Sequence, residues 1–458
     1  MGGEWADCMT ALLLRLRGII QKVAAATGLS SYAVLNTYEP ETVADFENEY
    51  YRSGGSDTTF TGLLSFSRAS TATYFDQNGD LQTAATSSPR VGHHVYNGTS
   101  WVNQGLLLEP SRTNLHVKSE DLSFYNQVER GSLSYSGSAP DGGTNNAILY
   151  TENSSTGRRL ALYTGILSTT GIKTFSVFAK DNGRRYLQLI CERFDGFGAI
   201  FDLSGGAVTD TASIGSGTYL ASNIYPVGNG WYRCAVTGNA NRGDFRPMIE
   251  IRNSSTYGGT QFDSYTGDNS SGVYFWGMQV ESGYNPTSYI ATTTASVARA
   301  ADSLTIAGTD LTYDSTNMSF AMDGVITYAD EGTAAQHTFF EWVADANNYI
   351  SMDLDTDSTD TGEVNGNQSA TGTLTTVAAT SSYSAGAYVP YSIAMRNTSS
   401  AINIAKDGTA ETEDTSPTQL PDLSATSLVF AEDNAVMTVK TFRQWGDDIT
   451  DAGIEAAS

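Results

Sequence analysis

The chain has 458 residues, of which 40% are hydrophobic and only 16% are charged. Many Gly, Ser, Thr and Tyr residues favour a sheet protein with many turns over a long-helix protein or a coiled coil. The 25 basic and 50 acidic residues give a formal net charge of −25, which argues against nucleic acid and against an anionic membrane as partners.

The chain begins with a predicted amphipathic helix over residues 4–26, followed by a short helix around residues 41–51. Apolar residues recur at three- and four-residue steps in the first helix and form one stripe. The stripe includes Trp5, Leu12, Leu16 and Ile20. It packs either within its own chain or against a partner or sister subunit, and we expect it to serve as an anchor.

Short strands separated by turns are predicted from residue 60 onward. Asn78-Gly79, Asn97-Gly98 and Asp407-Gly408 each lie between strand-like runs and predict hairpins, because Asn, Asp and Gly tolerate positive φ. Strands at intervals of about ten residues over 172–300 indicate a β-sandwich or jelly roll. The pattern resumes after residue 302 and ends in a short helix over 449–457 that Thr450 is expected to cap.

The charge distribution changes near residue 300. Residues 301–458 contain 24 acidic and 4 basic side chains, whereas residues 1–300 contain 26 and 21. We take this change as a domain boundary. The predicted fold class is mainly β, with tandem β-sandwich or jelly-roll domains behind a short helical N-terminal anchor. The expected segments are 1–60 (anchor), 61–118 (connecting module with hairpins), 119–300 (jelly roll resembling carbohydrate-binding domains) and 301–458 (second sandwich).

Aromatic residues in a polar loop are the best candidates for a binding site. The loop over residues 253–272 contains Tyr257, Phe262 and Tyr265 near Asp268. Sugar C–H faces stack on aromatic rings and sugar hydroxyls need polar partners, so these four residues form a candidate glycan site. The alternative is that the rings cover the end of a sandwich.

Asp353, Asp355 and Asp357 alternate along a predicted strand and its turn, which suits Ca²⁺ ligation; the alternative is a solvated acidic hairpin. No other cofactor is expected. The sequence contains no GxSxG, GxGxxG, phosphate-loop or HExxH pattern, and no carboxylate pair is singled out for glycoside hydrolysis. We therefore expect no enzyme activity. Cys8, Cys191 and Cys234 are far apart and are expected to be free thiols.

Residues 62–458 resemble phage virion fibre and spike proteins with jelly-roll and concanavalin/laminin-G-like modules. The resemblance is carried, in chain order, by LLSFSRAS, SSPRVGHH, GLLLEPSRTNL, TFSVFAKDNGRRYLQL, NGWYRCAV, VYFWGMQVESGYNPTSYIATT, VARAADSLTI, FFEWVADANNYISMDL, AINIAKDG and TFRQWGDDITDAGIEA.

The resemblance implies a structural protein of the virion surface, assembled in the host cytoplasm. It would be a tail or head fibre or spike that contacts other virion proteins through residues 1–60 and binds host-surface glycans. It also implies a homo-oligomer, most simply a trimer. The alternatives are a polysaccharide depolymerase and a capsid decoration protein without a receptor.

Overall fold

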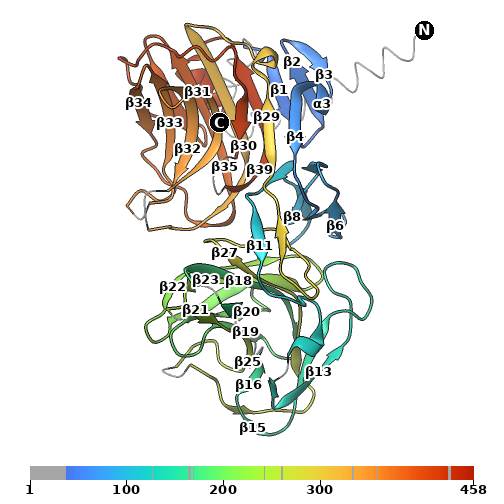
Figure 1. Cartoon of the computed structure of the whole chain (residues 1–458). Coiled ribbons are helices and arrows are strands. Elements are labelled where there is room, and N and C mark those ends of the chain that lie inside the picture. Colours follow the sequence, from blue (N-terminus) through green and yellow to red (C-terminus); the bar gives the residue numbers. More distant parts are fainter. Residues whose placement is uncertain are drawn as a thin grey trace, which may run out of the picture.

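The computed structural model describes residues 38–458 except 126, 163–166, 169, 242, 259–260, 333–334, 358 and 432–434. Two β-sandwich bodies lie end to end and meet at a narrow waist (Figure 1). The expected mainly β fold is therefore confirmed. The helix predicted over residues 4–26, with its anchor residues, lies outside the described residues. No helix in the described part of the chain is long and apolar enough to span a membrane.

The upper body in Figure 1, which we call the sandwich domain, consists of two antiparallel sheets. The larger sheet has the order β3 (Ser56–Thr58), β2 (Tyr50–Ser53), β1 (Thr42–Asp45), β39 (Val436–Trp445), β30 (Asn317–Tyr328), β35 (Gly386–Thr398), β36 (Ile402–Lys406) and β37 (Thr409–Ala410); β10 (Leu106–Leu108) also pairs with β39, and β7 (Arg90–Val91) with β10. The smaller sheet has the order β34 (Thr373–Ala378), β33 (Val364–Ala370), β32 (Asn348–Asp355), β31 (Gln336–Asp345), β38 (Leu428–Phe430), β29 (Ser303–Ile306) and β4 (Leu64–Ser67).

Strands from before residue 68 complete this domain. Thr42 is the register partner of Gln444 between β1 and β39, and β4 forms the edge beside β29. Residues 42–58 form three strands joined by turns, so the short helix expected around 41–51 is wrong. Val43 and Ala44 are buried, which is the environment that a strand inside a sheet provides. Strand pairing therefore joins part of the expected anchor segment to the expected C-terminal sandwich.

The lower body, which we call the insert domain, comprises residues 115–296 and contains two six-stranded antiparallel sheets. One sheet has the order β12 (Gln127–Glu129), β16 (Arg159–Leu162), β25 (Pro247–Arg252), β19 (Tyr186–Cys191), β20 (Phe197–Asp202) and β21 (Ala207–Ser213). The other has the order β13 (Gly131–Tyr135), β14 (Ile148–Glu152), β27 (Gly272–Ser282), β18 (Ile172–Asn182), β23 (Trp231–Asn239) and β22 (Thr218–Pro226). Two-stranded ribbons pair β15 (Thr156–Gly157) with β26 (Tyr265–Thr266) and β17 (Leu167–Ser168) with β24 (Asp244–Phe245).

The chain enters and leaves the insert domain through one antiparallel ribbon at the waist. Strands β11 (Arg112–Asn114) and β28 (Val297–Arg299) form it, and Asn114 lies opposite Val297. Two predicted hairpins precede it in the chain, β5 (Ala72–Phe75) with β6 (Leu81–Ala84) and β8 (His94–Tyr96) with β9 (Trp101–Asn103). Positive φ at Gly79 and Gly98 confirms both turns. The jelly roll is thus inserted into the sandwich domain rather than placed before it.

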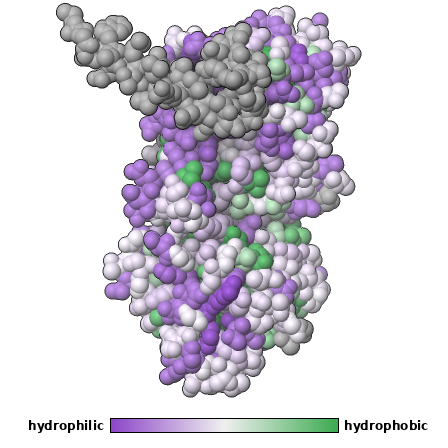
Figure 2. Space-filling view, turned by 180° about the vertical axis from the view of Figure 1, so that it is seen from behind, coloured by the Kyte–Doolittle hydropathy of each residue, from purple (hydrophilic) through white to green (hydrophobic). Residues whose placement is uncertain are grey.

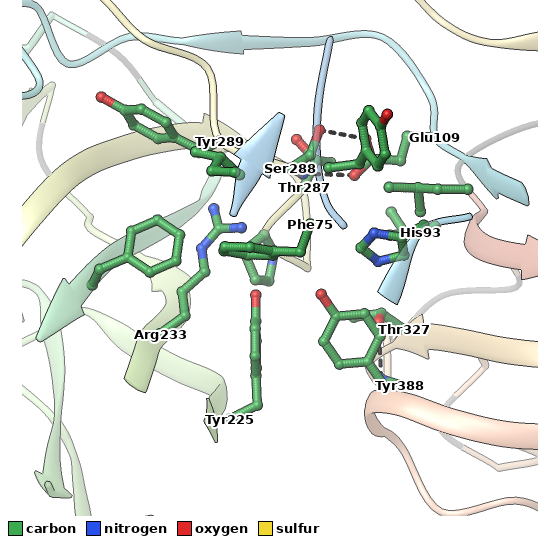
Figure 3. Close-up of a pocket in the computed structure, with 16 residues that line it drawn as sticks. Phe75, His93, Glu109, Tyr225, Arg233, Thr287, Ser288, Tyr289, Thr327 and Tyr388 are labelled. Atoms are coloured by element: carbon green, nitrogen blue, oxygen red, sulfur yellow. Dashed lines mark hydrogen bonds between the residues drawn. The ribbon is translucent and has the colours of Figure 1, made fainter. Parts of the chain in front are cut away.

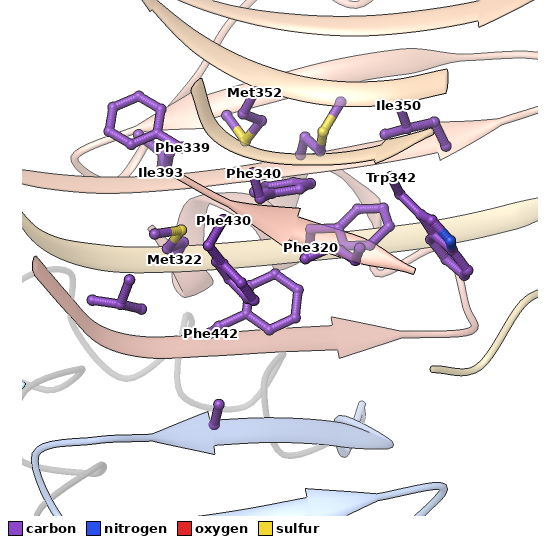
Figure 4. Close-up of a cluster of buried hydrophobic side chains, with 14 of the residues drawn as sticks. Phe320, Met322, Phe339, Phe340, Trp342, Ile350, Met352, Ile393, Phe430 and Phe442 are labelled. Carbon is purple, nitrogen blue, oxygen red and sulfur yellow. The ribbon is translucent and has the colours of Figure 1, made fainter. Parts of the chain in front are cut away.

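Each domain has its own hydrophobic core. Aromatic rings pack against one another in the core of the sandwich domain, where Phe320 packs on Phe340 at 5.2 Å and Phe430 on Phe442 at 4.9 Å between ring centroids (Figure 4). The core of the insert domain includes Cys191 and Cys234, which are buried free thiols as expected.

Helices are few in the described residues. They are α3 (Phe60–Leu63), α4 (Thr450–Ala457) and the 3₁₀ turns Leu122–Phe124 and Gly308–Asp310. Helix α4 confirms the closing helix, but Ile449 rather than Thr450 occupies its cap position.

Candidate functional site

A buried network of arginines and carboxylates lies at the waist. Arg68 Nη1 donates to Asp302 Oδ1 at 2.9 Å, and Arg90 donates both to Asp302 and to Glu109, the latter at 2.5 Å. Arg299 approaches Glu109 at 3.6 Å. Each of these five side chains is at most 2% exposed. A buried charge is costly unless it has a partner, so every member of the network must keep its contacts. The network therefore fixes the relative positions of the segments that carry these residues.

These residues come from the segments that carry the resemblance to phage fibres. FSRAS contributes Arg68, SSPR contributes Arg90, LEPSR contributes Glu109, and VARAADS contributes Arg299 and Asp302. Burial by itself would raise the pKa of Glu109, but the two arginines outweigh it and hold this pKa well below its usual range. Ser288 of the insert domain also donates to Glu109 at 2.6 Å, so these segments meet at the junction between the two domains, a role that sequence reasoning missed.

An open groove with a volume of about 530 Å³ lies beside this network. Its lining combines four hydroxyl side chains, two arginines and small apolar residues: Ala69, Ser70, Ser111, Arg112, Thr113, Leu115, Ser282, Ala298, Arg299 and Ala300. We call it the waist groove. Apolar residues also appear at the level of the waist in Figure 2, between the polar surfaces of the two domains.

Two arginines stand directly opposite each other in the register of the ribbon that forms the groove. Arg112 and Arg299 are register partners of β11 and β28, and both line the groove. Gly283 makes room for Arg112, because a Cβ there would lie 2.9 Å from Arg112 Nη2. Nε of Arg299 is buried and has no hydrogen-bond partner among the described residues. Arg299 is buried and pairs with Glu109, so Arg112 is the arginine that the groove presents to an anionic group.

A second, largely enclosed cavity of about 30 Å³ lies where the hairpins and both domains meet (Figure 3). We call it the waist cavity. Its polar lining includes His93 from the hairpin region, Tyr225 and Arg233 from the insert domain, and Tyr388 from the sandwich domain.

The loop predicted to bind glycans folds against the outer face of a sheet in the insert domain. The Tyr257 hydroxyl accepts a hydrogen bond from Gln188 at 3.0 Å, and the guanidinium of Arg252 lies 5.5 Å from the ring centroid. Phe262 packs beside Leu160, Ile190 and Met248, under the guanidinium of Arg158 at 5.0 Å. Both rings therefore cover apolar and arginine side chains of the sheet.

Tyr265 and Asp268 belong to a neighbouring cluster. The Tyr265 hydroxyl donates to Glu152 at 3.0 Å, and Arg159 lies 3.8 Å from its ring centroid. Asp268 is exposed and accepts hydrogen bonds from the backbone N–H groups of Ser270 and Ser271, whose hydrogen bonding lowers the pKa of its carboxyl. The structure gives each predicted residue an intramolecular partner, and glycan binding at this loop stays a prediction.

The predicted calcium ligands are not brought together. Asp353 is buried and accepts hydrogen bonds from Ser351 at 3.1 Å and Asn367 at 2.6 Å. Asp355 instead accepts the backbone N–H of Asp357 at 2.7 Å in the following turn. Among the residues that the structure describes, no group of three or more acidic, His or Cys side chains is placed to hold a metal ion. The alternating aspartates thus accept hydrogen bonds within the sheet, at Asp353, and within the following turn, at Asp355.

No family model matches the sequence. No curated protein matches it either. Solved structures with local similarity include the NanB sialidase of Streptococcus pneumoniae, with 15% identity over 34% of this chain and 26% of that chain and a TM-score of 0.27. Others are the binding domains of botulinum neurotoxin serotypes D and G, with 10% and 12% identity, the same 34% of this chain and 39% of those chains, and TM-scores of 0.26 and 0.28. The similarity spans well under half of each of these proteins.

Proposed function

We propose that this chain is an attachment protein of a phage particle and that the waist groove binds a host-surface glycan carrying a carboxylate. The observation that carries the glycan assignment is the Arg112 side chain in a hydroxyl-lined groove of about 530 Å³. Ligand pockets of this size hold one or a few sugar units. A fork of guanidinium donors matches a carboxylate, and Ser and Thr hydroxyls match sugar hydroxyls.

The distribution of charge supports the insert side as the part that faces the host. Residues 115–296 contain 13 basic and 15 acidic side chains, so nearly all of the net charge of −25 belongs to the rest of the chain. A nearly neutral domain approaches an anionic cell surface more easily than a strongly acidic one. The first described residue, Tyr38, lies on the sandwich domain, where its carbonyl accepts the indole N–H of Trp445 at 3.1 Å. Attachment to the particle through residues 1–60 would leave the insert domain outermost.

The proposal assigns binding without bond cleavage. The virion location and the trimer in this proposal come from the sequence resemblance to fibres. If residues 1–60 anchor the protein, replacing Leu12, Leu16 and Ile20 together by Ser should release it from particles. Light scattering on the purified chain tests the trimer, because a monomeric mass at micromolar concentration would contradict it.

Glycan binding is tested with acidic and neutral polysaccharides from host envelopes, using calorimetry on the full chain. We expect binding of the acidic polymer and about a tenfold loss of affinity for Arg112→Ala, because hydrogen bonds to charged groups are the strong ones. Arg185→Ala is the matched control, since the Arg185 side chain is 52% exposed and pairs with Asp202 away from the groove. Equal binding by both variants and the unmodified chain would place the site elsewhere. Shortening of the polymer during incubation would indicate a depolymerase.

A further inference from the structure

The waist cavity is bounded by three parts of the chain that are far apart in sequence. Figure 3 shows the hydroxyl groups of Tyr225 and Tyr388 facing the middle of the cavity, with Arg233 on one side and His93 on the other. The rings of Tyr225 and Tyr388 meet edge to face at 4.9 Å between centroids. Polar groups of both domains thus converge on one small space.

Several of these polar groups are buried without a partner. Both ring nitrogens of His93 and Nε of Arg233 have no hydrogen-bond partner within the described part of the chain. His93 is 3% exposed and Arg233 is 4% exposed. Leaving buried donors unsatisfied costs free energy, so these groups indicate that the cavity is occupied in solution.

Tyr388 is held in a strained conformation beside the cavity. Its φ is 52°, in the left-handed region that bulky side chains rarely adopt, and its backbone N–H donates to Oγ1 of Thr327 at 3.0 Å. Such strain persists where the surroundings impose it, and it is common at binding sites. Here it directs the Tyr388 side chain across the waist to the insert domain.

Positive charge exceeds negative charge among the buried groups at the waist. The described buried groups are four arginines and three carboxylates: Arg68, Arg90, Arg233, Arg299, Glu109, Glu281 and Asp302. Burial, together with Arg90, lowers the pKa of His93 to about 3, so its ring is neutral and supplies one N–H donor. One buried positive charge therefore lacks a compensating charge, and a buried charge without a counter-charge is costly.

We propose that the waist cavity binds one small monovalent anion of the size of chloride, held by Arg233, by the hydroxyl groups of Tyr225 and Tyr388, and by a ring N–H of His93. The excess of buried arginines over buried carboxylates around the cavity disfavours a cation. A sugar or other organic anion is too large for about 30 Å³. The anion neutralises the excess charge and satisfies donors from both domains, so it stabilises the arrangement of the domains. This site is separate from the waist groove and does not depend on glycan binding.

The test measures the melting temperature of the full chain in sodium chloride, sodium bromide and sodium gluconate at one ionic strength. A ligand that binds only the folded state raises the melting temperature with its concentration. We expect chloride and bromide to raise it progressively relative to gluconate. We expect Tyr388→Phe, which keeps the ring but removes a donor, to weaken the apparent halide affinity about tenfold.

Arg233→Gln should abolish the halide dependence, whereas Arg396→Gln should retain it, because Arg396 pairs with Asp448 and Asp451 at the surface of the sandwich domain. Crystals grown in bromide give an independent readout that does not require the variants to fold. An anomalous peak in the waist cavity would support the proposal. Water alone in the cavity, or the same halide response in the unmodified chain and Tyr388→Phe, would overturn it.

Discussion

Asp302→Asn tests the view that the buried network holds the two domains together. The Asp302 carboxylate accepts hydrogen bonds from Arg68, from Arg90 and from the backbone N–H of Glu109, the first and last at 2.9 Å. An amide of the same shape removes the charge and turns an N–H₂ group toward one of the arginines. Breaking a buried ion pair by removing one partner costs about 3–5 kcal/mol. We expect a loss of that size in the free energy of unfolding.

The control is a second arginine–carboxylate contact in the same chain. Asp448 accepts two hydrogen bonds from Arg396, at 2.8 and 2.9 Å, but its side chain is 28% exposed. Pairs that water reaches contribute about 0–1 kcal/mol, so Asp448→Asn should cost no more than that. Urea denaturation followed by tryptophan fluorescence gives both values. If Asp302→Asn costs no more than Asp448→Asn, the network does not hold the waist and our interpretation of the shared segments is wrong.

Three further predictions follow from burial, close contacts and topology. Burial, opposed by Arg252, raises the pKa of Glu250 from 4.5 to about 8, so between these pH values the folded chain keeps a proton that the unfolded chain loses. The free energy of unfolding should therefore fall between about pH 5 and pH 8, by up to ~1.4 kcal/mol per pH unit. Glu250→Gln should flatten this slope in denaturation curves. Gly98 and Gly105 both have positive φ, but a Cβ on Gly98 would meet no atom within 4 Å, whereas a Cβ on Gly105 would lie 2.1 Å from the carbonyl oxygen of Val439. Gly98→Ala should lower the free energy of unfolding by about 1 kcal/mol and Gly105→Ala by more than about 3 kcal/mol. Equal melting temperatures of the two variants would contradict this prediction. Residues 301–458 expressed alone should not unfold cooperatively in circular dichroism, because they lack the strands that earlier residues contribute, whereas the full chain should.

Local sequence patterns predicted the strands better than their partners. The hairpin at Asn78-Gly79 and the run that forms β18 are visible in the sequence because alternation and turn residues are local signals. The pairing of Thr42 with Gln444 spans most of the chain, and no local pattern encodes which distant strand is the neighbour. Non-local pairing is therefore the reason that local patterns place residues 42–60 in the anchor and residues 61–67 in the connecting module, rather than in the sandwich domain.

The site was harder to predict than the fold for a related reason. Tyr257 and Phe262 were correctly recognised as loop aromatics, but the partner of Phe262, Arg158, lies over 100 residues earlier in the sequence. Ordered motifs such as FSRAS and LEPSR were visible, yet their role depends on three-dimensional contacts of Arg68 and Glu109 that spacing cannot supply. One sequence signal could have identified the junction between the two domains: these segments carry arginines but otherwise contain little charge.

The ribbon of β11 and β28 gives the molecule a mechanical property. Because Asn114 lies opposite Val297, the two ends of the insert domain are adjacent. A pull that reaches the insert domain through the waist acts on both of its ends together and does not draw them apart. Two covalent crossings share that load, and unravelling the insert domain requires a force applied within it. A load applied between the two domains would therefore leave the insert domain folded, because it does not separate the two ends of that domain.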